Sequence, residues 1–365
     1  MHHAADVSRF GSSERSELDD LAERLKRRAP PQLVASLRFR QVLVGERTTP
    51  EPLLVARRHI LDFTTEQLHE LAMPVPMSRL LFAYLDEIRA YAEVAPYMPP
   101  LDFPTAMHAA ACQRALPGPV GAALLCYYIG LHMLDDVHDD ELPEGIERNE
   151  ASLVALTCVA SLPALMLMGA WWPAPRRVRQ RLSTELHFHA HPTMTGQFLD
   201  ISKSTSCDLP HAYEVIAQRN GAIGRVFGRI AAIAAGCNEA DIDRLGQAVA
   251  CMSMASQVLD DIENLWNRPV SSDATNHAKT LPLCFVLDRR ADLREQILGL
   301  CDDRCPESHG RLRELLAAYG GLHFGLLGVA LFRSRARRAL QDPGTRAPVD
   351  ELAGYLLEAT APTDG

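Results

Sequence analysis

Two pairs of aspartates stand close together in the segment 134–145, LDDVHDDELPEG: Asp135 with Asp136, then Asp139 with Asp140. Residues four apart share one face of an α-helix, so Asp135 stacks on Asp139 and Asp136 on Asp140. The apolar run before them, LLCYYIGLHML, predicts a helix that enters the core and ends at these acids, where the helix dipole disfavours negative charge. A hard cation such as Mg²⁺, which prefers carboxylate and phosphate oxygens, would neutralise them. An acidic helix end exposed to water is the alternative interpretation.

A second acidic cluster ends another apolar helical run, QAVACMSMASQVL, about 125 residues further along. Asp260 and Asp261 form the pair, Gln257 lies almost one turn before Asp260, and Asn264 lies one turn after it on the same face. Two apolar helices that each end in paired aspartates predict carboxylates meeting across a cavity, where Mg²⁺ can bind a diphosphate. Basic residues are then expected at the phosphate end. The candidates are Arg219, Arg225, Arg268 and Lys279.

The elements that must position these acids read as helices along the whole chain. Apolar runs of helical period, such as 118–134, 222–236 and 241–259, alternate with short Pro, Gly or Asp breaks, and β-branched alternation is weak. We therefore predict an all-α fold of ten or more helices, several of them buried on most faces. The segment 97–104, YMPPLDFP, is predicted to be a loop. The uncharged stretch 151–172 favours a buried central helix over a membrane span.

Length and charge narrow the class of protein further. The chain has 365 residues, 47% of them hydrophobic, and a net charge of −9, which argues against general nucleic-acid binding. The N-terminus is polar, without the apolar core of a signal peptide. Nine cysteines show neither CxxC pairs nor zinc spacing, so we interpret them as reduced thiols that fill core positions in a cytoplasmic protein. We expect an N-terminal helical extension with a polar tail at 1–75, including a surface helix near 16–28, and one catalytic domain at 76–365.

At this point the sequence resembles the class I isoprenoid synthases, and most closely their trans-polyprenyl diphosphate synthase branch. That branch carries a DDxxD motif, matched by 135–139, and a Q-x-x-D-D-x-x-D motif, matched by 257–264 except that Asn264 replaces the last aspartate. Its K-P-x-x-S-D…K-x-T-L-P-L stretch is similar to 268–283, and its GQ-x-x-D element to 196–200. The segment QRNGAIGRVFG resembles its K-T-G-x-L-F helix, with Arg219 at the lysine position.

The resemblance implies a fold, a reaction and a set of site residues. The fold is a helical bundle around a central active-site cavity, usually in a homodimer, and the substrate is a linear allylic prenyl diphosphate such as farnesyl or geranylgeranyl diphosphate. Three Mg²⁺ ions are expected to bind the diphosphate as the allylic C–O bond breaks. The residues that it implies are, as catalytic acids, Asp135, Asp136, Asp139, Asp260 and Asp261; as metal ligands, Asp135, Asp139, Asp260 and Asn264; as diphosphate ligands, Arg219, Arg268, Lys279 and Gln257; and as pocket residues, Tyr127, Tyr128, His132 and Gln197.

The chain departs from the chain-elongating members where they bind isopentenyl diphosphate. Those members have a G-G-K-R element before the first motif, whereas the region here, APYMPPLDFPTAMHAAACQRA, has no Lys or Arg before Arg114. They also have Arg-Arg-Gly shortly after the first motif, where this chain has Pro143-Glu144-Gly145. An acid there repels a diphosphate. The half of the site that ionises the allylic substrate is therefore kept, and the half for a second diphosphate is missing.

Three functions are compatible with this pattern. The leading hypothesis is a terpene synthase, which cyclises or deprotonates the cation, or captures it with water, and releases diphosphate. The first alternative is a prenyltransferase, either a chain elongator with a rebuilt second site or an enzyme that prenylates another acceptor; Arg114, Arg148 and the arginines of 176–181 are candidates for such a site. The second alternative is a non-catalytic partner subunit, which the intact aspartates argue against.

Overall fold

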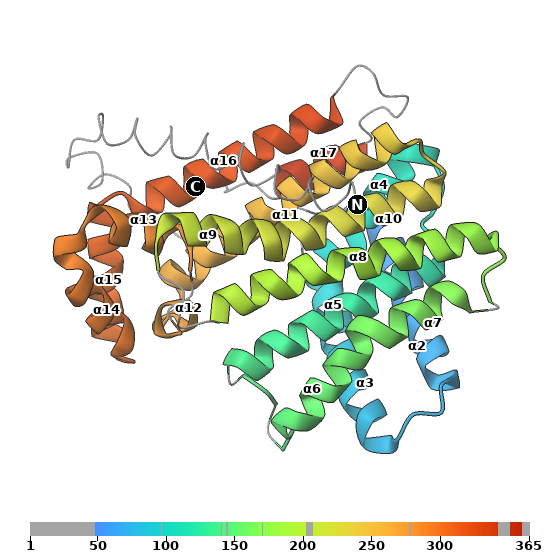
Figure 1. Ribbon diagram of the computed structural model, residues 1–365, viewed down its shortest axis with the longest axis horizontal. Helices are drawn as coiled ribbons and strands as arrows, with labels where there is room; N and C mark the ends of the chain where they lie inside the picture. Colours follow the sequence, from blue (N-terminus) through green and yellow to red (C-terminus); the bar gives the residue numbers. More distant parts are fainter. Residues whose placement is uncertain are drawn as a thin grey trace.

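The computed structural model describes residues 48–95, 97–139, 141–143, 145–169, 171–201, 207–276, 279–341 and 351–359. Every regular element in these ranges is a helix, so the predicted all-α fold is confirmed (Figure 1). The helix predicted near 16–28 lies outside the described residues. Of the predicted extension 1–75, the structure describes α2 (Glu51–Glu70), whose Leu53, Ile60 and Leu68 are buried in the same core as the later helices. The boundary at residue 75 stays a prediction.

The helices α3 (Val75–Val94) and α4 (Pro99–Cys112) follow α2 and pack around it. The loop predicted at 97–104 is wrong, because α4 begins at Pro99. Prolines suit the first turn of a helix, where the backbone N–H has no intrahelical partner, so two successive prolines start this helix instead of preventing it. A buried ion pair then fixes α4 to α2. Arg57 donates to Asp102 at 2.8 and 2.6 Å and to the carbonyl oxygens of Ala92 and Ala95.

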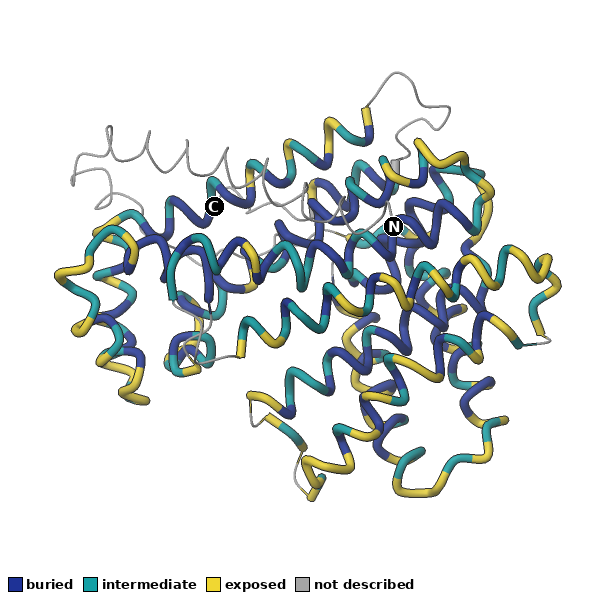
Figure 2. Tube along the Cα trace, viewed as in Figure 1, coloured by how far each residue is buried: buried dark blue, intermediate teal, exposed yellow. Residues whose placement is uncertain are grey.

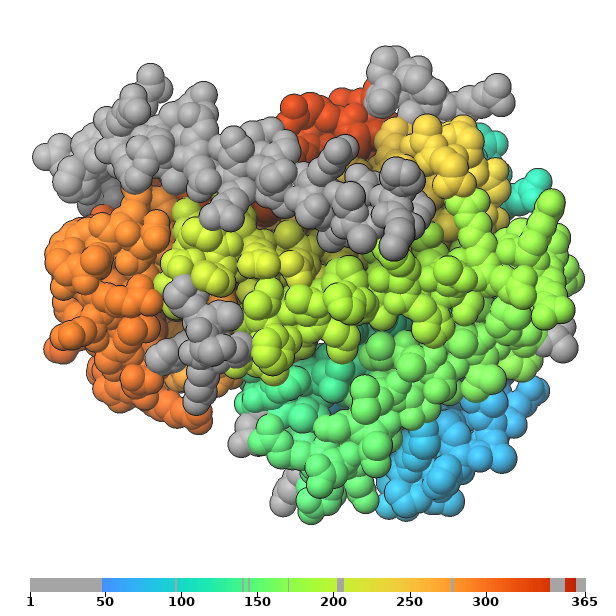
Figure 3. Space-filling model, in the orientation of Figure 1, coloured from blue at the N-terminus to red at the C-terminus, as the bar shows by residue number. Residues whose placement is uncertain are grey.

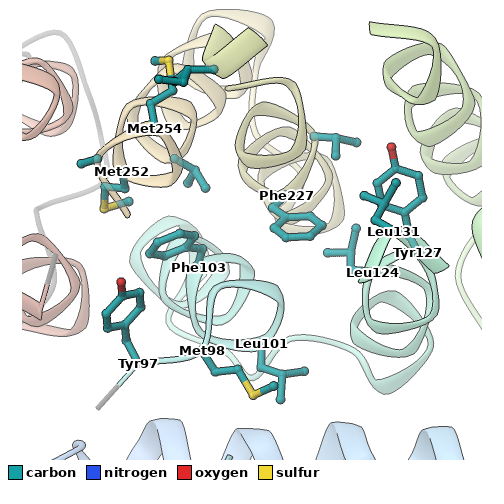
Figure 4. Packing of buried hydrophobic residues seen from close by; sticks show 14 of the residues in the cluster. Tyr97, Met98, Leu101, Phe103, Leu124, Tyr127, Leu131, Phe227, Met252 and Met254 are labelled. Atoms are coloured by element: carbon teal, nitrogen blue, oxygen red, sulfur yellow. The ribbon is translucent and has the colours of Figure 1, made fainter. Parts of the chain in front are cut away.

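The core lies among α4, α5 (Gly118–Asp139), α10 (Ala222–Ala235) and α11 (Glu239–Asn267), with α10 packed against both α4 and α11. Figure 2 shows these helices as long buried stretches, and Figure 4 shows Phe103 of α4 and Phe227 of α10 within the packed interior. Three of these four helices, α5, α10 and α11, were predicted from their apolar runs, whereas α4 was not. Burial of their apolar faces gives the acids of α5 and α11 a rigid support.

The most apolar stretch of the chain does not occupy the centre. It forms one helical run of α6 (Arg148–Leu156), the π-helix η2 (Thr157–Ser161) and α7 (Leu162–Met168), and α7 packs against α5 and α8 (Arg176–Ile201). One side of this run is exposed, with Leu153 at 67% and Leu156 at 54%. The predicted central helix is therefore a surface helix with an apolar outer stripe. Figure 3 shows this run and α8 side by side on one green face.

Two described helices have the length and hydropathy of a membrane span. They are α5, with 72% of its apolar window buried inside the fold, and Arg148–Met168, with 44% buried. A bent pair, α15 (Pro306–Ala318) and α16 (Gly321–Leu340), meets the same criteria together, with an angle of 65° between its helices. These are statements of length and composition. The apolar character of α5 is accounted for by its packing inside the bundle.

Shorter helices complete the bundle around the ends of α8 and α11. The helix α16 lies along α11, and α13 packs against α16 and α9. The remaining bounds are α9 (Leu209–Ile216), η3 (Ala217–Gly221), α12 (Ser272–Thr275), α13 (Leu281–Arg289), η4 (Ala291–Leu293), α14 (Arg294–Asp302) and α17 (Glu351–Ala359).

Candidate active site

The first acidic cluster lies at the C-terminal end of α5, whereas the second lies inside α11, which continues past Asp261 to Asn267. The C-terminal ends of α5 and α8 also reach the side of the molecule where α12 lies (Figure 1). A hydrogen bond of 3.0 Å from the Asn276 side-chain amide to Asp139 connects the turn after α12 to the first cluster. Elements that are far apart in sequence therefore meet at the predicted site.

Arg219 is the resident counter-charge of the first cluster. Its guanidinium donates to Asp135 at 2.6 Å and to Asp200 at 2.7 Å. Burial alone would lower the pKa of Arg219, but Asp135 and Asp200 outweigh it, and the charge of Asp261 in the second cluster also raises that pKa. Arg219 thus interacts electrostatically with acids from both motifs. The sequence predicted Arg219 as a diphosphate ligand but did not indicate that it pairs with Asp135 or Asp200.

A π-helical turn and one glycine bring Arg219 to this position. Arg219 and Asn220 lie in η3, and such π-turns within α-helices are frequent at functional sites. Gly196 of α8 faces η3 so closely that a Cβ atom on it would lie 2.3 Å from the backbone nitrogen of Arg219. The glycine therefore permits contact between α8 and η3. The next residue, Gln197, donates a 2.6 Å hydrogen bond to Asp135.

Asp136 faces away from Arg219 and contacts α3. The hydroxyl of Tyr84, a residue 2% exposed, donates a 2.6 Å hydrogen bond to Asp136. The imidazole of His132 lies 3.6 Å from the other carboxylate oxygen and edge-on to the Tyr84 ring. Burial, followed by the bond to Asp136, raises the pKa of Tyr84, so the hydroxyl keeps its proton and stays a donor. Sequence reasoning missed Tyr84, because nothing in the local pattern of α3 marks it.

The second cluster is held by amide side chains. Gln257 donates to Asp261 at 2.8 Å and accepts a 2.7 Å hydrogen bond from Asn220 of η3. Asn264 was predicted as a metal ligand, and this role stays a prediction. Its amide oxygen accepts a 2.6 Å hydrogen bond from Ser271, so it holds the turn that precedes α12. A metal-ligand role for Asn264 requires that this turn release the oxygen.

Two more of the predicted diphosphate ligands, Arg268 and Lys279, lie close to α12, one before it and one after it in the chain. Lys279 is 5% exposed, and its ammonium donates to the carbonyl oxygen of Asp200 at 2.5 Å. Arg268 is exposed, and its guanidinium lies 3.5 Å from the Ser272 hydroxyl. A pocket of about 410 Å³ lies here between α11 and α12. It is lined by Gln257, Asp260, Glu263, Asn264, Asn267, Arg268 and Asp273.

Burial and neighbouring acids raise the pKa values of Asp260 and Asp273. Surrounding protein, followed by the charges of Glu263 and Asp273, raises the pKa of Asp260 to about 7, although Asp260 borders the open pocket. Burial and then Asp200 raise the pKa of Asp273 to about 7, with Asp139 contributing. Sequence reasoning left Asp200 and Asp273 out of the site, although both stand inside the motifs that carried the resemblance.

The predicted pocket residues separate into two groups. Tyr127 is fully buried in the hydrophobic core between Leu124 and Leu131, so its position does not favour contact with a substrate (Figure 4). Tyr128 is half-buried on α5, its ring centroid lies 6.2 Å from that of His132, and burial and then the charges of Asp260 and Asp135 raise its pKa. A second pocket, of about 970 Å³ and mostly apolar, lies between α2 and α4 and is lined by none of the predicted site residues.

Crowded carboxylates of this kind are the donor set that Mg²⁺ prefers, so the residues at the site fit the implied metal in chemistry. Within the described ranges, however, no three His, Cys, Asp or Glu side chains converge on one point as a preformed metal site. Asp135 is paired with Arg219, and Asp139 with Asn276. Binding of metal therefore requires a rearrangement of these side chains, together with the oxygens of a substrate.

Comparisons with known proteins agree with this picture. Residues 151–319 match the polyprenyl synthetase family, a segment that holds the second acidic cluster but begins after the first. No curated protein sequence matches the chain significantly. Solved structures with the same fold include a geranylgeranyl pyrophosphate synthase from Lactobacillus brevis (TM-score 0.64, 19% identity, 91% of this chain and 98% of that one). Another is the enzyme of that name from Pyrococcus horikoshii (TM-score 0.69, 18% identity, 84% and 96%).

A third structure of this fold contains ligands. It is a polyprenyl synthase from Caulobacter crescentus complexed with calcium and isoprenyl diphosphate (TM-score 0.65, 18% identity, 85% of this chain and 93% of that one). At such identities the structures establish the fold, and the family match adds sequence similarity over 151–319. The resemblance to polyprenyl synthetases is thereby confirmed in sequence over 151–319 and in fold over most of the chain.

Proposed function

We propose that this protein is a magnesium-dependent prenyltransferase of the polyprenyl diphosphate synthase type, which ionises a linear allylic prenyl diphosphate and transfers its prenyl group to a second substrate. The observation that carries the proposal is that η3 contacts both acidic clusters, because Arg219 pairs with Asp135 and Asn220 donates to Gln257, the hydrogen-bond partner of Asp261. The family match and the names of the structural relatives favour prenyl transfer over the terpene synthase reaction that the sequence led us to expect first.

In this proposal, some residues of the site act on the diphosphate leaving group, and others surround the prenyl chain. Asp135, Asp139 and Asp260 would hold Mg²⁺, which supplies Lewis-acid stabilisation of the departing diphosphate. Arg219 and Lys279, both largely buried beside these acids, add fixed positive charge for the same anion. The aromatic ring of Tyr128, on the same helix as the first acidic cluster, would offer a surface that suits an allylic cation.

One basic residue supports a rebuilt site for the second substrate. Arg148 donates to the carbonyl oxygen of Val137 at 2.5 Å, so its guanidinium lies within the first acidic motif. The other candidates lie elsewhere. Arg114 lines the apolar pocket between α2 and α4, and Arg181 pairs with Glu239 on the surface. We therefore propose Arg148 as the basic group that takes over from the arginines of chain-elongating members.

A terpene synthase is the second candidate, and a specific observation favours it. The segment in which chain-elongating members carry basic residues is packed here into the core, with Tyr97 at 9%, Met98 at 3% and Phe103 at 0% exposure. Arg57, the nearby cation, is fully engaged by Asp102 and two carbonyl oxygens. This part of the chain therefore presents apolar groups instead of a diphosphate site.

One assay tests the proposed function and separates the candidates. Purified protein is incubated with Mg²⁺ and geranyl, farnesyl, geranylgeranyl or geranylfarnesyl diphosphate, each with and without isopentenyl diphosphate. Hexane extracts and the phosphatase-treated aqueous phase are analysed by mass spectrometry. Longer prenyl alcohols that require isopentenyl diphosphate support prenyl transfer. A hydrocarbon or terpene alcohol formed without isopentenyl diphosphate identifies a terpene synthase, and release of no diphosphate from any substrate contradicts both.

We also propose a homodimer through the exposed face of α6, α7 and α8. Exposed apolar residues occur in pairs three apart on the α6–α7 run, Leu153 with Leu156 and Leu165 with Met168, and α8 exposes a further group. In Figure 3 the α6–α7 run and α8 lie on one continuous face. A second copy of the chain is the occupant that the family resemblance implies. The exposed residues are Leu153, Leu156, Leu165, Met168, Phe188, Phe198 and Ile201.

A further inference from the structure

Two of the nine cysteines contact one another, at the end of the molecule where α9 and α13 pack together. The Sγ atoms of Cys207 and Cys284 are 3.2 Å apart, although 77 positions separate the residues in the chain. Cys284 is fully buried within α13, whereas Cys207, just before α9, is partly exposed. The sequence predicted thiols that fill separate core positions, and nothing in the spacing of these two indicated a pair.

The surroundings of the pair shift the pKa values of its two thiols in opposite directions. The hydrogen bond with Cys284 lowers the pKa of Cys207, and the positive charges of Lys279 and Arg294 lower it further, against burial and the charge of Asp208. The guanidinium of Arg294 also donates to the Cys207 carbonyl oxygen at 3.4 Å. Burial raises the pKa of Cys284 well above its usual range. The accessible thiol is therefore also the more acidic one, which is the property of an attacking cysteine.

We propose that Cys207 and Cys284 form a reversible dithiol–disulfide site that takes a small-molecule disulfide as its oxidant. The thiolate of Cys207 attacks one sulfur of the oxidant, forms a mixed disulfide and releases a thiolate. The Cys284 sulfur then attacks the Cys207 sulfur, its proton passes to the second thiolate that leaves, and the two protein sulfurs become bonded. The protein loses two electrons and two protons, and the oxidant becomes two thiols.

The geometry favours this second step over reaction with a neighbouring cysteine. A disulfide needs sulfurs about 2.05 Å apart, so the pair must approach by roughly 1 Å from its present contact. Cys301 is fully buried, and burial followed by the charge of Cys207 raises its pKa, but the described residues show no contact between the sulfurs of Cys301 and Cys207. The new bond would connect the start of α9 to α13 and close a loop of the chain that holds α10 and α11.

The experiment is a thiol map of the full-length protein. Reduced protein is incubated with oxidised glutathione, the remaining thiols are alkylated with iodoacetamide, and tryptic peptides are analysed without reduction. Cys207 and Cys284 lie on different tryptic peptides, 204–219 and 280–289, so their bond joins two identifiable fragments. We expect the joined peptide, its disappearance after dithiothreitol, and a higher melting temperature of the oxidised protein, because the cross-link restricts the unfolded chain.

Three variants make the outcome decisive. Cys207→Ser should remove the joined peptide, and Cys284→Ala should leave glutathione attached to Cys207, because the resolving thiol is gone. Cys305→Ser is the matched control, since Cys305 is partly exposed and its thiol donates to Glu307; it should behave as the unaltered chain. Alkylation of both thiols after oxidation, or a bond between Cys207 and Cys301, overturns the proposal. None of these outcomes depends on the proposed enzymatic activity.

Discussion

Arg219 and Asp135 form an ion pair, with the guanidinium nitrogen 2.6 Å from the carboxylate oxygen, and a second nitrogen of Arg219 lies 2.7 Å from Asp200. The positive charge that the first acidic cluster requires is thus supplied in part by the protein itself. The oxygen of Asp135 that accepts from Arg219 cannot bind a metal ion at full strength while that ion pair is kept. Binding of Mg²⁺ and diphosphate should therefore move Arg219 from the carboxylate to the phosphate oxygens.

The first prediction concerns that exchange. Arg219→Gln removes a positively charged donor from the leaving diphosphate, so kcat should fall by roughly 100-fold. Arg219→Lys should restore part of the rate, because it keeps the charge but loses the planar fork. Steady-state kinetics measure both. Arg181→Gln, which breaks an exposed pair with Glu239, is the control and should leave the rate unchanged. Equal rates for the variants at 219 and 181 would remove Arg219 from the proposed site.

The acids themselves give the second prediction. Asp135→Ala and Asp260→Ala should each abolish turnover and keep the fold, because Asp200 still pairs with Arg219 in the first variant and the second relieves repulsion from Glu263 and Asp273. Circular dichroism and an activity assay distinguish the two effects. EDTA should stop the unaltered enzyme and Mg²⁺ should restore it. Asp62→Ala, which removes an exposed partner of Arg89, is the control for loss of a carboxylate. Unfolding of the Asp135 or Asp260 variants would instead make these acids structural.

A third prediction tests how α8 positions Arg219. A Cβ atom at Gly196 would lie 2.3 Å from the Arg219 nitrogen, a contact that only backbone movement relieves. Gly196→Ala should therefore lower stability by roughly 1–3 kcal/mol and reduce turnover together with it. Chemical denaturation and kinetics measure the two losses. Gly299→Ala is the matched control, because no atom lies within 4 Å of the added carbon, and it should be neutral or slightly stabilising. A neutral Gly196→Ala variant would contradict this close contact.

The fourth prediction follows from the raised pKa values of Asp260 and Asp273, both about 7 against the usual 3.8. At pH values between 3.8 and about 7, these two carboxyl groups therefore keep their protons in the folded state but lose them in the unfolded state. Without divalent metal, stability should therefore fall as pH rises from about 4 to 7, and stay low above that range. Melting temperatures measured in EDTA from pH 5 to pH 8 test this. Asp273→Asn should flatten the curve, and an unchanged slope would show that Asp273 is not the titrating group.

The fifth prediction concerns assembly. Leu156 and Phe198 are 54% and 63% exposed on the apolar face of α6–α8. A charge buried in an interface without a partner is strongly unfavourable, so Leu156→Glu and Phe198→Glu should each shift a dimer toward monomer. Light scattering coupled to size-exclusion chromatography measures the mass. Val75→Glu, which alters a residue 68% exposed on α3, is the control and should leave the mass unchanged. A monomeric unaltered chain would refute the proposed dimer.

Much of the bundle follows from local pattern. The apolar period of 241–259 predicted α11, and the pairing of aspartates after an apolar run marked both acidic motifs, because a helix and its charged end are visible within a few turns of sequence. The segment 97–104 shows the limit of such inference. Its prolines suggested a loop, yet proline also starts helices, and the buried bond of Asp102 to Arg57 selects the helix.

The sequence by itself determined that this protein is helical, where its paired carboxylates stand, and which family it resembles, since periodicity, charge and motif order are properties of neighbouring residues. Which residues these side chains contact was decided only by the tertiary structure. Tyr84 reaches Asp136 across 52 positions, and Arg219 reaches Asp135 across 84. Such contacts depend on how helices pack and on where a π-turn or a glycine allows close approach. For the same reason the packed structure places Tyr127 in the core and brings two distant cysteines together.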